Sequence, residues 1–119
     1  MYTSTNTAAI IRIVNHSGKR LSKNLIKDIF NNNDNINIPK GNNGLLNLKI
    51  IDNPDNFKSA EYTIIIYGDL YNHNNIDQIY DYLYNVCKQI ELNNITIKNA
   101  IGYIISTNNV NRTFQYVTK

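Results

Sequence analysis

A single apolar stripe occupies the segment from about Asn75 to Leu92, and any fold of this chain has to cover it. The stripe residues recur at the 3.6-residue spacing of an α-helix. Asp77 near the start and Lys88 near the end complement the helix dipole. The pattern predicts a helix that is capped by Asn74 or Asn75 and ends near Leu92. Its stripe comprises Ile76, Tyr80, Leu83, Cys87 and Ile90, with Ile79 and Val86 beside them.

Runs of β-branched residues on both sides of this helix predict strands. A shorter helix is expected at about residues 22–31, where Ser22 can cap the first turn. We expect Gly102 to mark a bend or bulge in the strand that contains it. The predicted strands cover residues 8–15, 45–51, 61–67 and 95–107, with a possible final strand at 113–117.

The element order is therefore β-α-β-β-α-β, with a possible extra C-terminal strand. That order predicts the α+β class, in which an antiparallel sheet carries two helices on one face. A chain of 119 residues suffices for a single domain with one core. Residues 1–7 are expected to form a flexible N-terminal tail of this domain.

The sheet face without helices is expected to meet solvent or a partner. Ile64 and Ile66 alternate along their strand with Ile65 and Tyr67, so both sides of that strand are apolar. Contiguous exposed apolar surface usually marks an interface. We therefore expect a protein partner or a two-fold homodimer, with Ile65, Tyr67 and Tyr103 at the interface. The tyrosines expected on the open face are Tyr2, Tyr62, Tyr67, Tyr103 and Tyr116.

Charge is unevenly spread along the chain, whose net charge is +3. Residues 1–27 carry five basic side chains and residues 93–119 carry three, and neither segment has an acidic one. All nine carboxylates lie between them. If the two ends are neighbours in the fold, they form a basic surface opposite an acidic one, which suits a polyanion on one side and a protein on the other. The alternative is that these cations are solvated and bind nothing.

Catalytic and metal-binding groups are sparse in the sequence. His16 and His73 stand in Asn-rich segments without a second ligand at metal-binding spacing. Cys87, the single cysteine, lies on the apolar stripe, which suits a buried thiol better than a nucleophile. We therefore expect no catalytic residue, no metal, no cofactor and no enzymatic activity. No apolar run reaches the length of a membrane span, so no membrane association is expected.

Asparagine and isoleucine are unusually frequent, with 23 and 20 copies. Both have AT-rich codons, so the bias indicates a low-GC genome, such as that of a large DNA virus, a low-GC bacterium or its phage, or a protist. The N-terminus lacks the pattern of a signal peptide. We expect an intracellular protein, located in the cytoplasm, or in the nucleus or virus factory if the source is viral.

Four short motifs follow one another: G-K-R-L at residues 18–21, N-I-P-K at 37–40, T-I-I-I-Y-G-D-L at 63–70 and I-T-I-K-N-A-I-G at 95–102. Their order resembles one repeat of the TATA-box-binding protein family, followed by the opening strand of a second repeat. Such divergent lobes occur in transcription factors of large DNA viruses. The sequence has Ala9 where the family has a minor-groove asparagine, and it lacks the family's phenylalanine wedges. The second lobe of the family's DNA-bending saddle is nearly absent.

The resemblance implies a non-enzymatic binding protein that contacts nucleic acid or the transcription machinery. Cations would neutralise phosphates, and Asn99 would donate to acceptors in the minor groove. The alternative is a small viral or phage-encoded interaction module, an inhibitor or adaptor, that uses the open sheet face. Salt dependence distinguishes the two, because nucleic-acid binding weakens steeply with salt. The candidate nucleic-acid-binding residues are Arg12, Lys49, Lys98 and Asn99.

Overall fold

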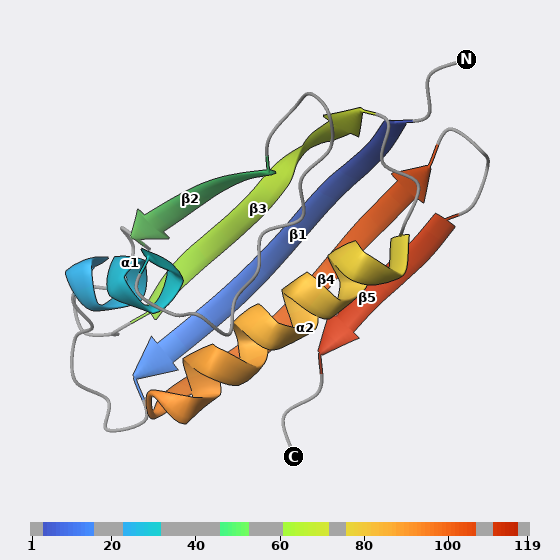
Figure 1. Cartoon of the computed structure of the whole chain (residues 1–119). Helices are drawn as coiled ribbons and strands as arrows, with labels where there is room; N and C mark the ends of the chain where they lie inside the picture. The colour runs from blue at the N-terminus through green and yellow to red at the C-terminus, as the bar shows by residue number, and fades with distance from the viewer. Residues whose placement is uncertain are drawn as a thin grey trace.

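An antiparallel sheet with strand order β2-β3-β1-β4-β5 forms the base of the computed structural model (Figure 1). The structure describes residues 4–15, 23–31, 46–52, 61–71, 76–106 and 111–116. The strands are β1 (Ser4–Asn15), β2 (Leu46–Asp52), β3 (Glu61–Tyr71), β4 (Ile95–Ser106) and β5 (Asn111–Tyr116). The helices are α1 (Lys23–Asn31) and α2 (Ile76–Leu92).

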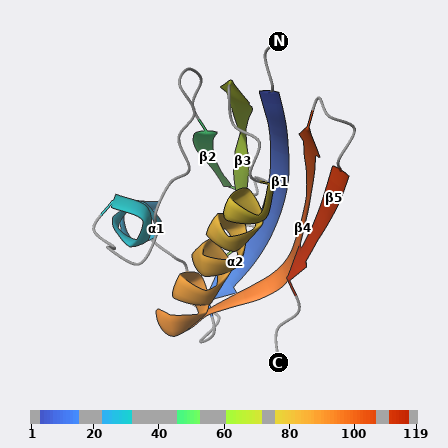
Figure 2. The ribbon, with the colours of Figure 1, turned by 45° about the vertical axis from the view of Figure 1, so that its right-hand side comes forward.

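Both helices lie on the same side of the sheet, as Figure 2 shows. The chain runs β1-α1-β2-β3-α2-β4, and β5 then adds to the outer edge of β4. Each helix therefore connects strands that are not neighbours in the sheet, which is the split β-α-β arrangement. The predicted α+β class, the two helices on one face and the extra C-terminal strand are confirmed.

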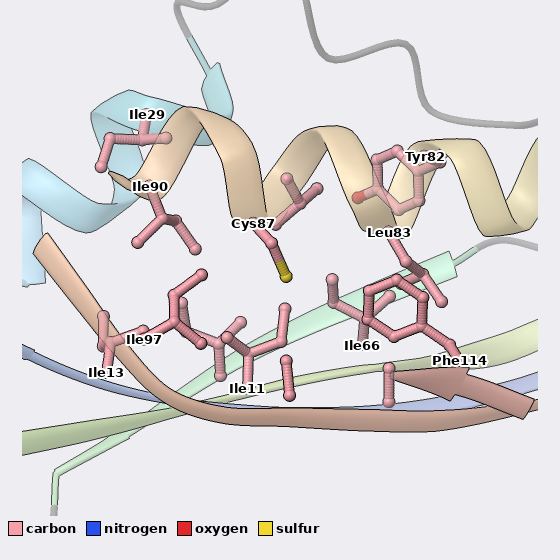
Figure 3. Close-up of a cluster of buried hydrophobic side chains, with 14 of the residues drawn as sticks. Ile11, Ile13, Ile29, Ile66, Tyr82, Leu83, Cys87, Ile90, Ile97 and Phe114 are labelled. Carbon is pink, nitrogen blue, oxygen red and sulfur yellow. The ribbon is translucent and has the colours of Figure 1, made fainter. Parts of the chain in front are cut away.

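The core lies between α2 and the sheet (Figure 3). Strand residues alternate between the two faces, so β1 buries every second side chain from Thr5 to Ile13. The predicted helix stripe is confirmed, except that Tyr80 is half-buried and Tyr82 is buried in addition. Tyr82 lies three residues after Ile79, so the buried side of α2 is one row wider than the sequence suggested.

Two asparagines, Asn93 and Asn94, follow the last residue of α2. Asn93 donates from its side chain to the Gln89 carbonyl at 2.8 Å, and its backbone N–H reaches the Ile90 carbonyl. Asn94 has a φ of 62°, the left-handed conformation that asparagine tolerates better than most residues. The chain can therefore reverse at once into β4, which begins at Ile95.

The expected N-terminal tail over residues 1–7 is wrong from Ser4 onward. Residues 4–7 pair with β3, and Thr5 to Thr7 also pair with β4. Thr5 and Thr7 are buried. This segment has no apolar residue, and its strand signal is limited to the β-branched Thr5 and Thr7, but two long neighbouring strands supply hydrogen-bond partners on both sides. Residues 1–3 lie outside the described part of the chain.

The prediction of a bend or bulge at Gly102 is also wrong, because the irregularity in β4 lies elsewhere. Gly102 pairs regularly with Ala9 and Phe114, and the irregularity lies between Arg12 and Ile13, which face Asn99 and Ile97. The glycine is needed for another reason, because a Cβ there would lie 2.9 Å from the Ala9 Cβ and 3.0 Å from the Ala8 carbonyl oxygen. β1 and β4 therefore approach each other closely at this point.

Candidate binding face of the sheet

The sheet side that faces away from both helices carries large exposed apolar residues on its three central strands. We call this side the open face. Its apolar patch consists of Ile10 on β1, Ile65 and Tyr67 on β3, and Ile101, Tyr103 and Ile105 on β4. Ile65 is half-buried, and the exposed fractions of the other five run from 44% to 59%. Since an exposed patch of this kind usually marks an interface, this is the first candidate site.

Strand register arranges five of the six patch residues in two rows across the sheet, and Ile105 lies in the next row, opposite Asn6. Ala8 pairs with Tyr67 on one side and Tyr103 on the other. In the next row, Ile10 pairs with Ile65 and Ile101. The two tyrosines therefore stand about 10 Å apart, two strand spacings, with only a methyl group between them.

The structure brings together the three residues that the sequence assigned to an interface, Ile65, Tyr67 and Tyr103. The wider set of open-face tyrosines was partly wrong. Tyr62 is buried at 4% exposure, because its place in the alternation of β3 turns it toward the helices. Tyr116 faces α2, where its hydroxyl donates to the Glu91 carboxylate. Tyr2 lies outside the described residues.

The four candidate nucleic-acid residues also lie on the open face. Arg12 pairs with Thr63 and Asn99, and Lys49 pairs with Ile65. The β4 irregularity leaves both Lys98 and Asn99 exposed between buried neighbours on either side. A bulge of this kind re-aims side chains, and here it turns two successive polar ones away from the core. Arg12 and Lys98 thus lie on neighbouring strands, as the sequence predicted.

Acidic and basic groups are not separated onto opposite surfaces, so that expectation was wrong. Lys98 Nζ lies 2.5 Å from Glu61 Oε1. Asp69 is exposed opposite Asn6, at the far end of the same face. On the helix side, Arg112 pairs with Asp77 and lies over the ring of Tyr80, 3.8 Å from its centroid. Cations from the acid-free C-terminal segment therefore meet carboxylates from the middle of the chain.

A shallow hollow of about 320 Å³ adjoins the polar end of the open face. It forms because β5 pairs with β4 only between Ala100 and Ile105, leaving the earlier edge of β4 without β5 beside it. Its lining is mixed in polarity and has no convergent group of charges. The lining residues are Ile97, Lys98, Asn99, Ala100, Ile101, Gln115 and Tyr116.

The described titratable groups with shifted pKa values belong to the core side. Burial raises the pKa of the Cys87 thiol to about 12, and the nearby Glu91 carboxylate adds to that effect. Burial and the hydrogen bond to Glu91 raise the pKa of Tyr116 as well. A thiol with so high a pKa is a poor nucleophile.

Within the described ranges, no group of three or more His, Cys, Asp or Glu side chains could hold a metal ion. His16 and His73 fall outside those ranges. Across the same described residues, no helix is both long enough and apolar enough to span a membrane.

Similarity to known proteins does not indicate a function for this chain, so its function has to be inferred from the open face. The chain matches no protein-family model, no curated protein and no solved structure at a significant level. The resemblance to a TATA-box-binding protein lobe therefore stays a prediction.

Proposed function

We propose that this chain is a binding protein that holds a protein partner through the open face of its sheet. The observation that carries the proposal is the apolar patch, which crosses three adjacent strands without interruption. Each fully buried Ile or Tyr side chain contributes about 1.5–3 kcal/mol relative to exposure. The six patch residues are already partly covered in the single chain, so a partner that buried the remainder would add a part of that contribution for each.

The surroundings of the patch support a protein partner. Polar residues border it on all sides: Asn6, Arg12, Lys49, Asp69, Asn99, Asn111, Thr113 and Gln115. An apolar centre with aromatic anchors and a polar, solvent-accessible rim is the usual composition of a protein interface. Charges of both signs stand in that rim, which suits a partner with its own mixed surface better than a uniform polyanion.

The test replaces Tyr67 and Tyr103 with serine in one variant. We expect the variant to fold, because both side chains are exposed, and to lose at least about tenfold in partner binding, because central aromatic residues dominate interface energies. The matched control is Tyr84→Ser, since Tyr84 lies on α2 with 45% exposure against 44% for Tyr67. Quantitative cross-linking mass spectrometry in extract of the native host measures both. Equal capture by wild type and the serine pair would count against the open face as the binding site.

A second candidate is single-stranded nucleic acid, and one observation favours it. Tyr67 and Tyr103 share the open face with Arg12, Lys49, Lys98 and Asn99, and bases stack on exposed aromatic rings of such sheets while cations hold phosphates. The resemblance to a TATA-box-binding protein lobe also implies nucleic acid, but as duplex DNA contacted in the minor groove. Glu61 and Asp69 on this face oppose it, because they repel phosphate.

Salt titration of binding to a labelled oligonucleotide separates the two candidates. With three cations on the open face, a plot of log affinity against log salt concentration should have a slope no steeper than about −2 for a single strand. Arg12→Gln is expected to make the slope shallower by about 0.7. Lys88→Gln on the exposed side of α2 is the control and should leave it unchanged. A signal absent at low salt, measured by fluorescence anisotropy, excludes the nucleic-acid candidate and leaves the protein-binding proposal intact.

A further inference from the structure

We infer that the partner of the open face is a second copy of this chain, packed sheet to sheet about a two-fold axis that runs across the strands. In this dimer the Arg12 end of each copy faces the Asp69 end of the other. The inference rests on the proposed function and names the occupant. It follows from two features of the face: the placement of its charges and the relief of its two central rows.

Arg12 and Asp69 stand at opposite ends of the face, and at the Arg12 end Lys98 and Glu61 already pair with each other. Asp69 pairs with Asn6, and Arg12 pairs with Thr63, so six residues of β1 separate the two rows. At about 3.3 Å per residue this is roughly 20 Å. The apolar rows of Ala8 and Ile10 lie midway between them. A two-fold axis between those rows therefore carries each Arg12 toward the partner copy's Asp69 end.

The shape of the patch is compatible with the same two-fold axis. The axis sets the row Tyr67–Ala8–Tyr103 of one copy against the row Ile65–Ile10–Ile101 of the other. The gap above Ala8, between the two tyrosines, then receives the partner copy's Ile10. Interfaces of stable complexes interdigitate in this way, and a two-fold contact requires that one patch complement itself.

The other in-plane axis, parallel to β1, is disfavoured by charge. It would place Arg12 opposite its own symmetry mate, and like charges in contact across an interface are repulsive.

The size of the open face is sufficient for the proposed dimer. The five strands together span roughly 24 Å across, and the shortest, β5 with 6 residues, is roughly 20 Å long, so the face covers at least about 480 Å² in projection, comparable with the roughly 800 Å² of accessible surface per partner in standard interfaces.

The experiment reverses one charge in each of two variants, Arg12→Asp and Asp69→Arg. Either change sets like charges against each other in the homodimer, so each variant alone should dissociate at least about tenfold more readily than wild type. Mixed in equal amounts, the two variants restore both opposite-charge contacts. We expect a heterodimer of nearly wild-type affinity in sedimentation velocity, with mass labelling of one variant to identify it.

Two controls separate geometry from general charge effects. Asp81→Arg makes the same reversal on the exposed side of α2 and should leave the dimer unchanged. Circular dichroism checks that each variant folds. Wild type that stays monomeric up to about 1 mM overturns the second-copy inference, whether or not cross-linking finds another protein or nucleic acid on the face. A dimer whose two reversed variants fail to prefer each other overturns the proposed geometry. Neither result contradicts the proposal that the open face binds a protein, which the Tyr67 and Tyr103 variants test separately.

Discussion

Leu83→Asp is expected to unfold the chain or drive it into aggregates. Leu83 is fully buried on α2, and Figure 3 shows its side chain pointing toward the sheet near Ile66 and Phe114. A carboxylate there loses its hydration without gaining a partner, at a cost of several kcal/mol. Small domains have only about 5–15 kcal/mol of stability, so this one change consumes much of it. Urea unfolding followed by far-ultraviolet circular dichroism measures the loss.

Two companion variants of the same helix identify the cause. Leu83→Ala keeps the site apolar and should cost about 2–5 kcal/mol, less than the aspartate. Lys88→Asp introduces the same carboxylate on the exposed side and should cost only about 1 kcal/mol, from the reversed interaction with the helix dipole. A soluble, cooperatively folding Leu83→Asp protein with near wild-type stability would show that this side of α2 does not pack on the sheet.

The helices and the faces of β3 could be predicted because their patterns are local. The stripe from Ile76 to Ile90 repeats at helical spacing, and all of it except Tyr80 is buried in the structure. Ile64 and Ile66 turn inward, whereas Ile65 and Tyr67 turn outward, as strict alternation requires. Alternation along a strand is therefore enough to assign Ile65 and Tyr67 to the open face.

The β4 bulge could not be predicted, and it decides which residues the open face presents. Continued alternation from Ile95 and Ile97 would have turned Ile101 and Ile105 inward, a reasonable expectation for isoleucines. The extra residue at Lys98 reverses the alternation, so the small Ala100 and Gly102 face α2 instead. No sequence signal marks the reversal, since it lies in how β4 pairs with the distant strand β1.

Long-range pairing explains the remaining errors. Charge segregation along the chain suggested one basic surface, but Lys98 and Glu61 meet across 37 positions, and Arg112 and Asp77 across 35. A linear charge pattern contains no information on which strands become neighbours. Similarly, Ser4 to Thr7 belong to a strand only because β3 and β4 extend far enough to pair with them.

Gly102→Ala is expected to destabilise the sheet by about 1–3 kcal/mol, the usual cost of adding a methyl group to a tightly packed site. The new Cβ would lie 2.9 Å from the Ala9 Cβ and 3.1 Å from the Ala9 Cα, so β1 and β4 would have to separate locally. Both strands lie in the centre of the sheet, and no loop can absorb the movement. Gly102→Val should cost more, because its two extra methyl groups enter the same space.

A double variant that combines Gly102→Ala with Ala9→Gly tests the contact between residues 9 and 102. Ala9→Gly alone should destabilise by about 0.5–1 kcal/mol, because glycine adds backbone entropy to the unfolded chain. The double variant lacks the Ala9 Cβ, which is the nearest atom to the new methyl group. Its loss of unfolding free energy should therefore be smaller than the sum of the two single losses, by at least about 0.5 kcal/mol. Recovery remains partial, because the Ala8 carbonyl oxygen still lies 3.0 Å from the new Cβ. Strictly additive costs in urea unfolding would mean that the two strands do not approach this closely at Gly102.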